Sequence, residues 1–363
     1  IPLWISSVES LSALNRFRYS YLGRQVSMTK SVIDKLGRPI RDLRISLTDQ
    51  CNFRCSYCMP KEVFGPEYAF LPKRELLDNK EVLLLVQCFT RLGVEKVRLT
   101  GCEPLLRRDL VDLVHAISTV KGVRDLSLTT NGSLLPRYAQ DLKDAGLNRI
   151  NVSLDSLDKD IFQKMSGGRG DPKSVIAGID ASLEAGLSIK TNMVVRKGVN
   201  VSEILPMVSY FRDRRITLRF IEYMDVGNTN QWKLNEVYPS NKILDIIRER
   251  YQFAPVDPNY RGEVATRYRY TDIPVEFGLI NSITKPFCSD CNRARLSADG
   301  KLYSCLFASN GHDLKNLVRS RIDKAEIVNA ISKIWINRHD RYSEERATGT
   351  QDSNKIEMSY IGG

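Results

Sequence analysis

The stretch Cys51-Asn52-Phe53-Arg54-Cys55-Ser56-Tyr57-Cys58 places three thiols within eight residues, at spacings of four and three. We call Cys51, Cys55 and Cys58 the first triad. A loop this short can bring all three sulfurs around one inorganic centre. Iron–sulfur clusters are held by cysteine thiolates, and closely spaced cysteines are their usual trace in a sequence. Three thiolates leave one iron of a four-iron cluster free to bind another molecule. A structural zinc site is normally closed by four ligands, so a zinc knuckle or three unrelated cysteines are the alternatives.

A second group of three cysteines follows about 230 residues later, and we call Cys288, Cys291 and Cys305 the second triad. Asp299-Gly300 lies between two short apolar runs and predicts a hairpin that returns the third thiol to the first two. A zinc site is the alternative for this triad alone. Arg293 and Arg295 favour an iron centre instead, because alternate residues of a strand share one face. A guanidinium fork there matches two phosphate oxygens at once.

Composition limits the class of partner. The 54 Lys and Arg residues exceed the 43 Asp and Glu residues, giving a net charge of +11. This excess suggests an anionic partner: nucleic acid, an acidic surface or a phosphorylated small molecule. Six of the eight cysteines fall in the two triads and no secretory signal is visible, which favours metal binding in a reducing compartment. No apolar run approaches the ~18 residues that would indicate a membrane span.

Residues 1–35 are predicted to be a flexible leader. The first thirty residues carry Arg16, Arg18, Arg24 and Lys30 but a single acid, Glu9. An acid-poor, Arg- and Ser-containing leader is typical of a mitochondrial transit peptide, which predicts a location in the mitochondrial matrix. The alternative is a merely basic terminus on a protein of a bacterial-type cytoplasm.

Hydrophobic patterning predicts an α/β fold. Strand-like runs alternate with helical stretches, which indicates βαβ units and a parallel sheet. Six units are short of a closed eight-unit barrel, so we predict an incomplete (βα)6 TIM-like barrel over residues 36–225, with an open sheet as the alternative. In both arrangements the loops at the carboxyl ends of the strands carry the site. The predicted strands are 43–48, 96–100, 126–130, 150–154, 189–195 and 218–224. The predicted helices are 74–92, 108–119, 134–145, 158–165, 173–185 and 200–213.

The alternation of predicted strands and helices ends after residue 225. Residues 226–363 are predicted to form a C-terminal region with a helix at 240–250, a strand at 275–283, the hairpin of the second triad and a helix at 323–338. We expect this region to bind the substrate.

In its sequence motifs, the chain resembles the GTP 3′,8-cyclase MoaA family, which are radical S-adenosylmethionine (SAM) enzymes of molybdenum-cofactor synthesis. The resemblance runs from about Leu43 to Gly363. The first motif below establishes only the radical SAM superfamily, whereas the second triad with Arg-x-Arg and the Gly-Gly end points to this family. The motifs are LRISLTDQCNFRCSYCM, KVRLTGCEPLLR, TTNG, INVSLDSL, RFIEYM, FCSDCNRARLSADGKLYSCLF and the terminal Gly-Gly.

The resemblance implies a radical SAM partial barrel with a C-terminal extension that carries a second iron–sulfur cluster. The first triad is then expected to hold a SAM-binding 4Fe–4S cluster, and the second triad another 4Fe–4S cluster whose open iron binds the guanine of GTP. Arg44, Arg293 and Arg295 are the expected catalytic residues. The expected SAM contacts are Tyr57, Cys102, Ser153 and Met224. The expected GTP contacts are Arg44, Arg98, Thr129, Lys190, Arg293, Ala294, Arg295, Gly362 and Gly363.

The resemblance also implies the reaction. Reductive cleavage of SAM gives a 5′-deoxyadenosyl radical, which takes the hydrogen from ribose C3′. The C3′ radical attacks guanine C8, and the product is (8S)-3′,8-cyclo-7,8-dihydroguanosine 5′-triphosphate. The implied partners are GTP, an electron donor and the next enzyme of molybdopterin synthesis, with a homodimer left open. Neither a stable nucleic-acid complex nor a membrane span is expected.

Two features of the residues bear on this resemblance. Arg44 and Arg98 lie inside apolar strands, where an unpaired charge is costly and an anionic ligand would compensate it. Cys102 replaces the second glycine of the family's Gly-Gly-Glu-Pro pattern. Its side chain is expected to crowd SAM or to strain a backbone with positive φ, and hence to weaken SAM binding or impair the enzyme. An extra cluster ligand at Cys102 is the alternative.

Two competing functions stay open from the sequence. One is another radical SAM enzyme with an auxiliary cluster, such as a peptide-modifying maturase. The other is a metal-stabilised nucleic-acid-binding protein, which the net charge favours. The scattering of the basic residues, without an aromatic-interleaved patch, counts against the second.

Overall fold

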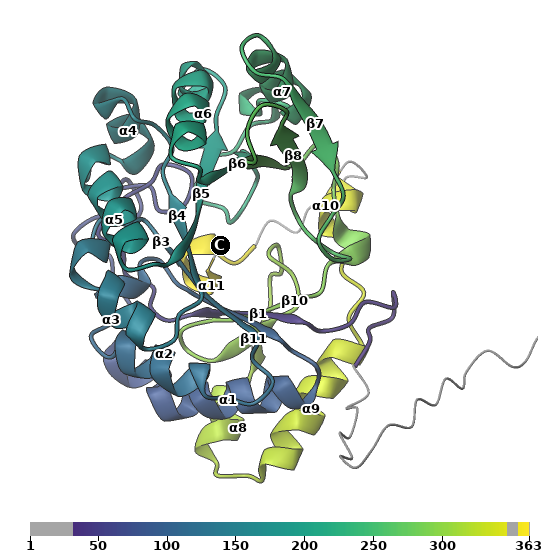
Figure 1. Cartoon of the computed structure of the whole chain (residues 1–363). Coiled ribbons are helices and arrows are strands. Elements are labelled where there is room, and N and C mark those ends of the chain that lie inside the picture. The colour runs from purple at the N-terminus through teal and green to yellow at the C-terminus, as the bar shows by residue number, and fades with distance from the viewer. Residues whose placement is uncertain (1–31, 347–354, 363) are drawn as a thin grey trace, which may run out of the picture.

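The computed structural model describes residues 32–346 and 355–362. The predicted transit peptide therefore lies outside the described residues, as does Gly363. The described strands form one twelve-stranded sheet that curves into an open, partial barrel with helices along its outer side (Figure 1). The strands are β1 Asp42–Ser46, β2 Lys96–Thr100, β3 Asp125–Thr130, β4 Arg149–Ser153, β5 Ser188–Val195, β6 Thr217–Glu222, β7 Phe253–Val256, β8 Thr266–Tyr270, β9 Glu276–Ile280, β10 Arg293–Leu296, β11 Lys301–Tyr303 and β12 His312–Asp313.

The six predicted strands are confirmed as β1–β6, and they pair in parallel in sequence order. The sheet has two further parallel strands, which the sequence did not assign to it. β10 pairs with β1 at one end and β9 pairs with β6 at the other. Antiparallel strands continue the sheet beyond both, in the order β12-β11-β10 and β9-β8-β7, so the barrel does not close.

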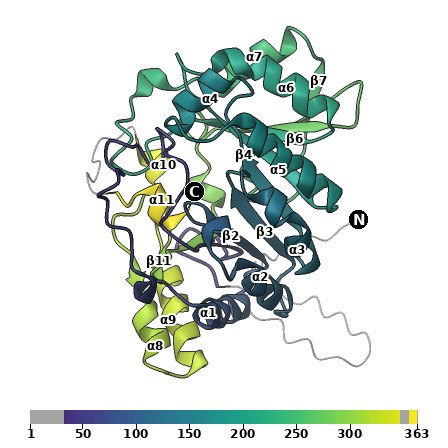
Figure 2. The same ribbon diagram turned by 90° about the vertical axis from the view of Figure 1, so that its left-hand side faces the viewer.

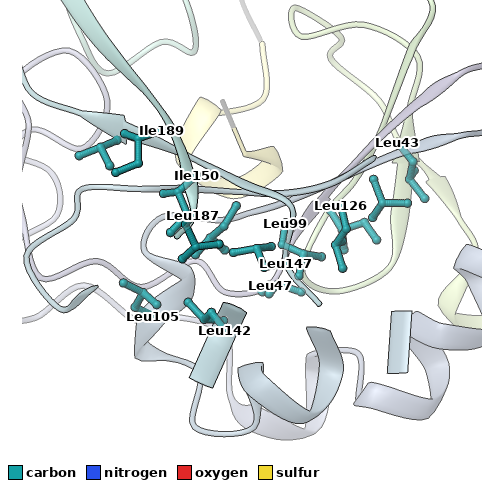
Figure 3. Packing of buried hydrophobic residues seen from close by; sticks show 14 of the residues in the cluster. Leu43, Leu47, Leu99, Leu105, Leu126, Leu142, Leu147, Ile150, Leu187 and Ile189 are labelled. Carbon is teal, nitrogen blue, oxygen red and sulfur yellow. The ribbon is translucent and has the colours of Figure 1, made fainter. Parts of the chain in front are cut away.

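The outer helices form where their apolar residues recur at helical spacing. In α1, Asp78 and Glu81 make a reciprocal capping box, and Val82, Val86 and Phe89 are buried. Leucine and isoleucine side chains from the strands, the helices and the loops between them pack together in the core (Figure 3). The helices are α1 Asn79–Arg91, α2 Leu110–Ser118, α3 Ala139–Asp144, α4 Lys159–Ser166, α5 Pro172–Glu184, α6 Ile204–Asp213, α7 Ser240–Arg248, α8 Lys315–Arg319, α9 Lys324–Ile336, α10 Tyr342–Glu345 and α11 Met358–Ile361.

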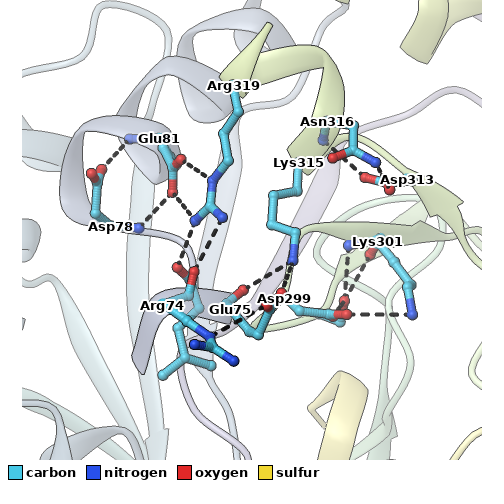
Figure 4. Close-up of polar contacts among 12 residues, drawn as sticks. Arg74, Glu75, Asp78, Glu81, Asp299, Lys301, Asp313, Lys315, Asn316 and Arg319 are labelled. Atoms are coloured by element: carbon cyan, nitrogen blue, oxygen red, sulfur yellow. Dashed lines mark hydrogen bonds and ion pairs between the residues drawn. The ribbon is translucent and has the colours of Figure 1, made fainter. Parts of the chain in front are cut away.

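The C-terminal region is fixed to the first barrel unit. Lys315 of α8 donates to Glu75 at 2.6 Å, and Arg319 donates to Glu81 at 2.7 Å (Figure 4). The hairpin with its Asp299-Gly300 turn is confirmed, because β10 and β11 pair antiparallel and Gly300 has a φ of 84°. Among the described residues, no helix has the length and apolar character needed to cross a bilayer.

Candidate active site

A cavity of about 650 Å³ lies on the inner side of the sheet and is lined by all six thiols of the two triads. Residues 58 and 305, from opposite ends of the chain, thus face a shared space, as the sequence predicted. All six cysteines are free of disulfides. Their burial is intermediate, so a group held by them would be partly enclosed by protein.

The first triad lies on the loop that follows β1. The loop is tight, since the Cys58 amide donates to the Cys55 carbonyl at 3.0 Å. Arg54 braces it from within, donating from Nη1 to the Cys51 carbonyl and from Nε to the Phe64 carbonyl, each at 2.7 Å. Burial raises the pKa of Cys51 to about 11 and that of Cys58 to about 12. The charge of Arg54 offsets only part of this effect at Cys51, so a cationic metal centre would be needed to hold the thiols as thiolates.

The predicted SAM residues Tyr57, Ser153 and Met224 line the same cavity. Asp155, which we did not predict as a site residue, joins them. Tyr57 donates its hydroxyl to Asp155 Oδ2 at 2.8 Å, and the Val194 amide donates to Asp155 Oδ1 at 2.8 Å. Burial raises the pKa of Asp155 to about 6. Its place directly after β4, at the carboxyl edge of a parallel sheet, was the signal in the sequence.

Cys102 lines the cavity beside the first triad, but the expected backbone strain is wrong. The left-handed conformation belongs to Gly101, with a φ of 138°, where an added Cβ would lie 2.8 Å from the Thr48 carbonyl oxygen. Cys102 itself does not have a positive φ. Its amide donates to the Thr48 carbonyl at 2.9 Å, and its thiol donates to the Ser359 carbonyl at 3.3 Å. The side chain is therefore accommodated without a strained backbone and touches the C-terminal segment.

The second triad is more electropositive than the first. Burial raises the pKa of Cys291, but the charges of Arg293 and Arg338 and a hydrogen bond from Arg293 outweigh it and lower the pKa to about 6. Burial raises the pKa of Cys305 to about 12. Within residues 32–346 and 355–362, no three Cys, His, Asp or Glu side chains converge closely enough to hold a single metal ion.

Between the triads, three arginines stand side by side across neighbouring strands. The parallel register pairs Arg295 of β10 with Arg44 of β1, and Arg44 with Arg98 of β2. Burial, followed by the charges of Arg98 and Arg295, lowers the pKa of Arg44 well below its usual range. The Nε atoms of Arg44 and Arg98 are buried without a hydrogen-bond partner among the described residues. Like charges directly opposite one another destabilise a sheet, so a bound anion would relieve the repulsion within this row.

The adjacent row, two residues earlier on each strand, is balanced. Arg293, Asp42, Lys96 and Asp125 follow one another across β10, β1, β2 and β3 with alternating charge. Within these two rows, the cations without a carboxylate neighbour in the register are therefore Arg295, Arg44 and Arg98.

The remaining predicted substrate residues differ in their placement. Thr129 and Lys190 line the cavity, and the Thr129 hydroxyl is buried with no partner among the described residues. Burial lowers the pKa of Lys190 to about 8. The side chain of Ala294 is buried but is not among those that line the cavity. Its neighbours Arg293 and Arg295 line it, as strand alternation requires.

Sequence reasoning missed several cationic residues of the cavity, among them Lys96, Arg149 and Arg219. Arg219 donates to Asn192 at 2.9 Å and to Asn151 at 2.6 Å, and burial lowers its pKa to about 9. The available signal was position, since Lys96 precedes Arg98 by two residues and Arg219 alternates with apolar residues in β6. Each therefore points to the inner face.

The C-terminal segment enters the cavity region, where α11 lies on the inner side of the sheet (Figure 2). Arg295 Nη1 donates to the Gly362 carbonyl at 2.5 Å. Gly362 has a φ of 72°, and an added Cβ would lie 2.3 Å from Thr100 Cγ2. Upstream, Lys355 donates to Asp225 Oδ2 at 2.8 Å, and Tyr342 donates to the same carboxylate at 2.6 Å. The segment is thus anchored at Asp225 and reaches Arg295.

Comparisons with known proteins agree with this geometry. Residues 45–211 match the Radical SAM superfamily, and residues 216–344 match Molybdenum Cofactor Synthesis C. The chain is 49% identical over 340 residues to the GTP 3′,8-cyclase of Staphylococcus carnosus (strain TM300), covering 93% of this chain and 100% of that protein. It is 48% identical, with the same coverage, to the GTP 3′,8-cyclase of Staphylococcus aureus (strain Mu3 / ATCC 700698).

Among solved structures, the fold is similar to that of Streptococcus suis SuiB bound to S-adenosylmethionine. The TM-score is 0.57 at 16% sequence identity, over 81% of this chain and 68% of that chain. At this identity the similarity concerns the fold alone.

Proposed function

We propose that this chain, which belongs to the GTP 3′,8-cyclase family of radical SAM enzymes, converts GTP into (8S)-3′,8-cyclo-7,8-dihydroguanosine 5′-triphosphate, the first step of molybdopterin synthesis. Family membership rests on 49% identity across the full length of a curated relative. The two matched regions lie consecutively along the chain, and both contribute residues to one cavity.

The observation that carries the choice of substrate is the row of Arg295, Arg44 and Arg98 between the two triads. Three neighbouring guanidiniums in a largely buried site repel one another, and two of them keep an unsatisfied Nε. A triphosphate supplies several negative charges and many acceptor oxygens, and guanidinium forks match such oxygens well. A neutral peptide substrate would leave this charge uncompensated.

We assign the first triad to a 4Fe–4S cluster that binds SAM. Three free thiols from one tight loop, next to a cavity, suit a cluster that keeps one iron open. When bound and reduced, cluster and SAM together supply the 5′-deoxyadenosyl radical. The chain contributes the enclosure: Tyr57, Cys102, Ser153 and Met224 border the space next to these thiols. Asp155 fixes the Tyr57 hydroxyl.

We assign the second triad to another 4Fe–4S cluster, which faces the guanine of GTP. Its three thiols line the cavity together with Arg293 and Arg295, which suits a cluster whose open iron faces an anionic ligand. Arg293 and Arg338 supply positive charge at Cys291. The proposed role of the protein is to hold GTP with its triphosphate on the arginine row. Thr129 and Lys190 contribute further donors, and Gly362 borders the ligand without a side chain.

Several further points are proposals of the same kind. We propose residues 36–225 and 226–363 as the two regions of the enzyme, an external electron donor, and transfer of the product to the next enzyme of the pathway. A homodimer stays open. The curated relatives described above are bacterial, so they give no support to the mitochondrial matrix. We therefore propose the bacterial-type cytoplasm, the alternative named above.

Anaerobic reconstitution tests the proposal. We expect about eight irons per chain, as two 4Fe–4S clusters require, and formation of 5′-deoxyadenosine that depends on GTP. Formation that depends on a peptide instead would favour a maturase. Tightly bound zinc with salt-sensitive RNA binding would favour the nucleic-acid-binding alternative and contradict the proposal.

A further inference from the structure

Three buried charged residues meet behind the second triad. The Asp34 carboxylate accepts from Arg38 Nε at 2.6 Å and from Arg338 Nη1 at 3.2 Å through the same oxygen, Oδ2. Asp34, Arg38 and Arg338 are 5%, 2% and 4% exposed. The segment before β1 runs beside the chain that follows α9 (Figure 1), where the Lys35 amide donates to the Arg338 carbonyl. Segments from opposite ends of the chain therefore form one buried ionic network.

Both guanidiniums of this network also bind the main chain of the second triad. Arg38 Nη1 donates to the Cys288 carbonyl at 2.7 Å, and Arg338 Nη1 donates to the Cys291 carbonyl at 2.7 Å. The first and the last cysteine of the Cys-x-x-Cys turn thus each have their carbonyl held by a charged donor. Charge-assisted hydrogen bonds of this kind are stronger and more directional than neutral ones.

Two donors of the network are left over: Arg338 Nε, which lies 3.4 Å from Asp340 Oδ2, and Arg38 Nη2. Arg38 Nη2 is buried and has no hydrogen-bond partner among the described residues, although Arg38 lines the cavity together with the second triad. Buried donors are nearly always satisfied in folded proteins, so a missing partner points to a ligand. An iron–sulfur cluster offers sulfur acceptors, and hydrogen bonds to those sulfurs tune its reduction potential.

We propose that Arg38 and Arg338, oriented by Asp34, are positioning residues for the second cluster. They hold the Cys288 and Cys291 carbonyls so that the thiols stay open towards a cluster, and Arg38 Nη2 donates to one of its sulfurs. This rests on the proposed second cluster. Within the described part of the chain, neither arginine hydrogen-bonds to Arg295, Arg44 or Arg98, so their role is exerted on the second triad and its cluster rather than on the substrate row.

The chain contains a matched control. Arg54 is also buried and donates to a carbonyl of the first triad, that of Cys51. The experiment compares Arg38→Met, Arg338→Met and Arg54→Met in the full chain after anaerobic reconstitution. The measurements are iron and sulfide per chain, and the electron paramagnetic resonance signals of the reduced protein with and without SAM. The SAM-sensitive signal reports the first cluster.

We expect about eight irons in the unaltered protein. Arg38→Met and Arg338→Met should fall to about four irons and keep the SAM-sensitive signal. Arg54→Met should lose that signal and keep the other. Arg38→Lys keeps the charge but not the fork, and it should retain more iron than Arg38→Met with an altered second signal.

Two results overturn the inference. Full iron with unchanged signals in Arg38→Met and Arg338→Met would mean that the network does not support the cluster. Equal loss of both signals in these variants would mean a general folding defect. If the unaltered protein itself holds only about four irons, the proposed second cluster and this inference fail together. Failure of the inference alone requires about eight irons in the unaltered protein.

Discussion

Replacing Arg44 with methionine should stabilise the ligand-free protein and weaken GTP binding. Arg44 stands between Arg98 and Arg295 in the parallel register, and its Nε has no partner among the described residues. Removing its charge relieves repulsion on both sides and leaves no carboxylate that depends on it alone. Asp42 keeps Arg293 and Lys96 as neighbours across the sheet.

The magnitude follows from strand spacing. Neighbouring strands lie about 4.8 Å apart, and two like charges about 5 Å apart repel by roughly 3 kcal/mol at an effective dielectric constant of about 20. Arg44 has two such neighbours, while attraction to Asp42 offsets part of the repulsion and the flexible side chains spread apart. We therefore expect a gain of about 1–2 kcal/mol, or roughly 1–3 °C in Tm. The lost charge-assisted hydrogen bond should weaken GTP binding by about 10- to 100-fold.

The assay measures Tm of the reconstituted protein with and without GTP, together with the GTP Kd by calorimetry. Arg149→Met is the matched control. Arg149 lines the same cavity but binds Asp125 through two hydrogen bonds of 2.8 and 2.7 Å. Its loss removes both hydrogen bonds from the Asp125 carboxylate, which keeps only Lys96 as a cationic neighbour in the register, and should lower Tm. A lower Tm for ligand-free Arg44→Met, with an unchanged GTP Kd, would refute the argument that the arginine row awaits an anion.

Three more outcomes are expected. Burial lowers the pKa of Lys190 to about 8; since lysine is charged only below its pKa, GTP affinity should fall as pH rises from 7 to 9, and calorimetry on Lys190→Met should find weaker binding without this fall. Gly362→Ala puts a Cβ 2.3 Å from Thr100 and should cut GTP-dependent 5′-deoxyadenosine formation about 10-fold or more. The control Gly198→Ala, at a similar φ but in open space, should leave this rate unchanged. Equal rates of 5′-deoxyadenosine formation in the two variants would contradict the reasoning. Cys102→Gly should raise the rate of SAM cleavage under reducing conditions, and an unchanged rate would count against crowding by the thiol.

Much of the fold was predictable because local patterns decide it. Alternating apolar runs bounded by glycine predicted β1 to β6, and the Asp299-Gly300 turn predicted the hairpin of the second triad. The parallel pairing of β10 with β1 was not predictable, because pairing partners far apart in sequence leave no local pattern. Arg295 lies opposite Arg44 only because of that pairing. The arginine row could therefore not be predicted from the sequence either.

The site shows the same division. The cysteine spacings predicted which thiols face the cavity, since short loops fix their own geometry. Asp155 and Arg219 were missed as site residues because their roles arise from neighbours on other strands. The strain expected at Cys102 was wrong because the sequence could not tell which of two adjacent positions has the positive φ. The structure assigns it to Gly101.

The pairing of β1 with β10 has a consequence for biosynthesis. The two strands are about 250 residues apart in the chain, and such non-local contacts form slowly. During translation, the hydrogen-bonding edge of β1 that β10 later covers stays open until the hairpin has left the ribosome. An iron centre delivered early to the first cysteine loop would meanwhile face solvent and oxygen. We therefore expect productive loading with metal to follow completion of the polypeptide.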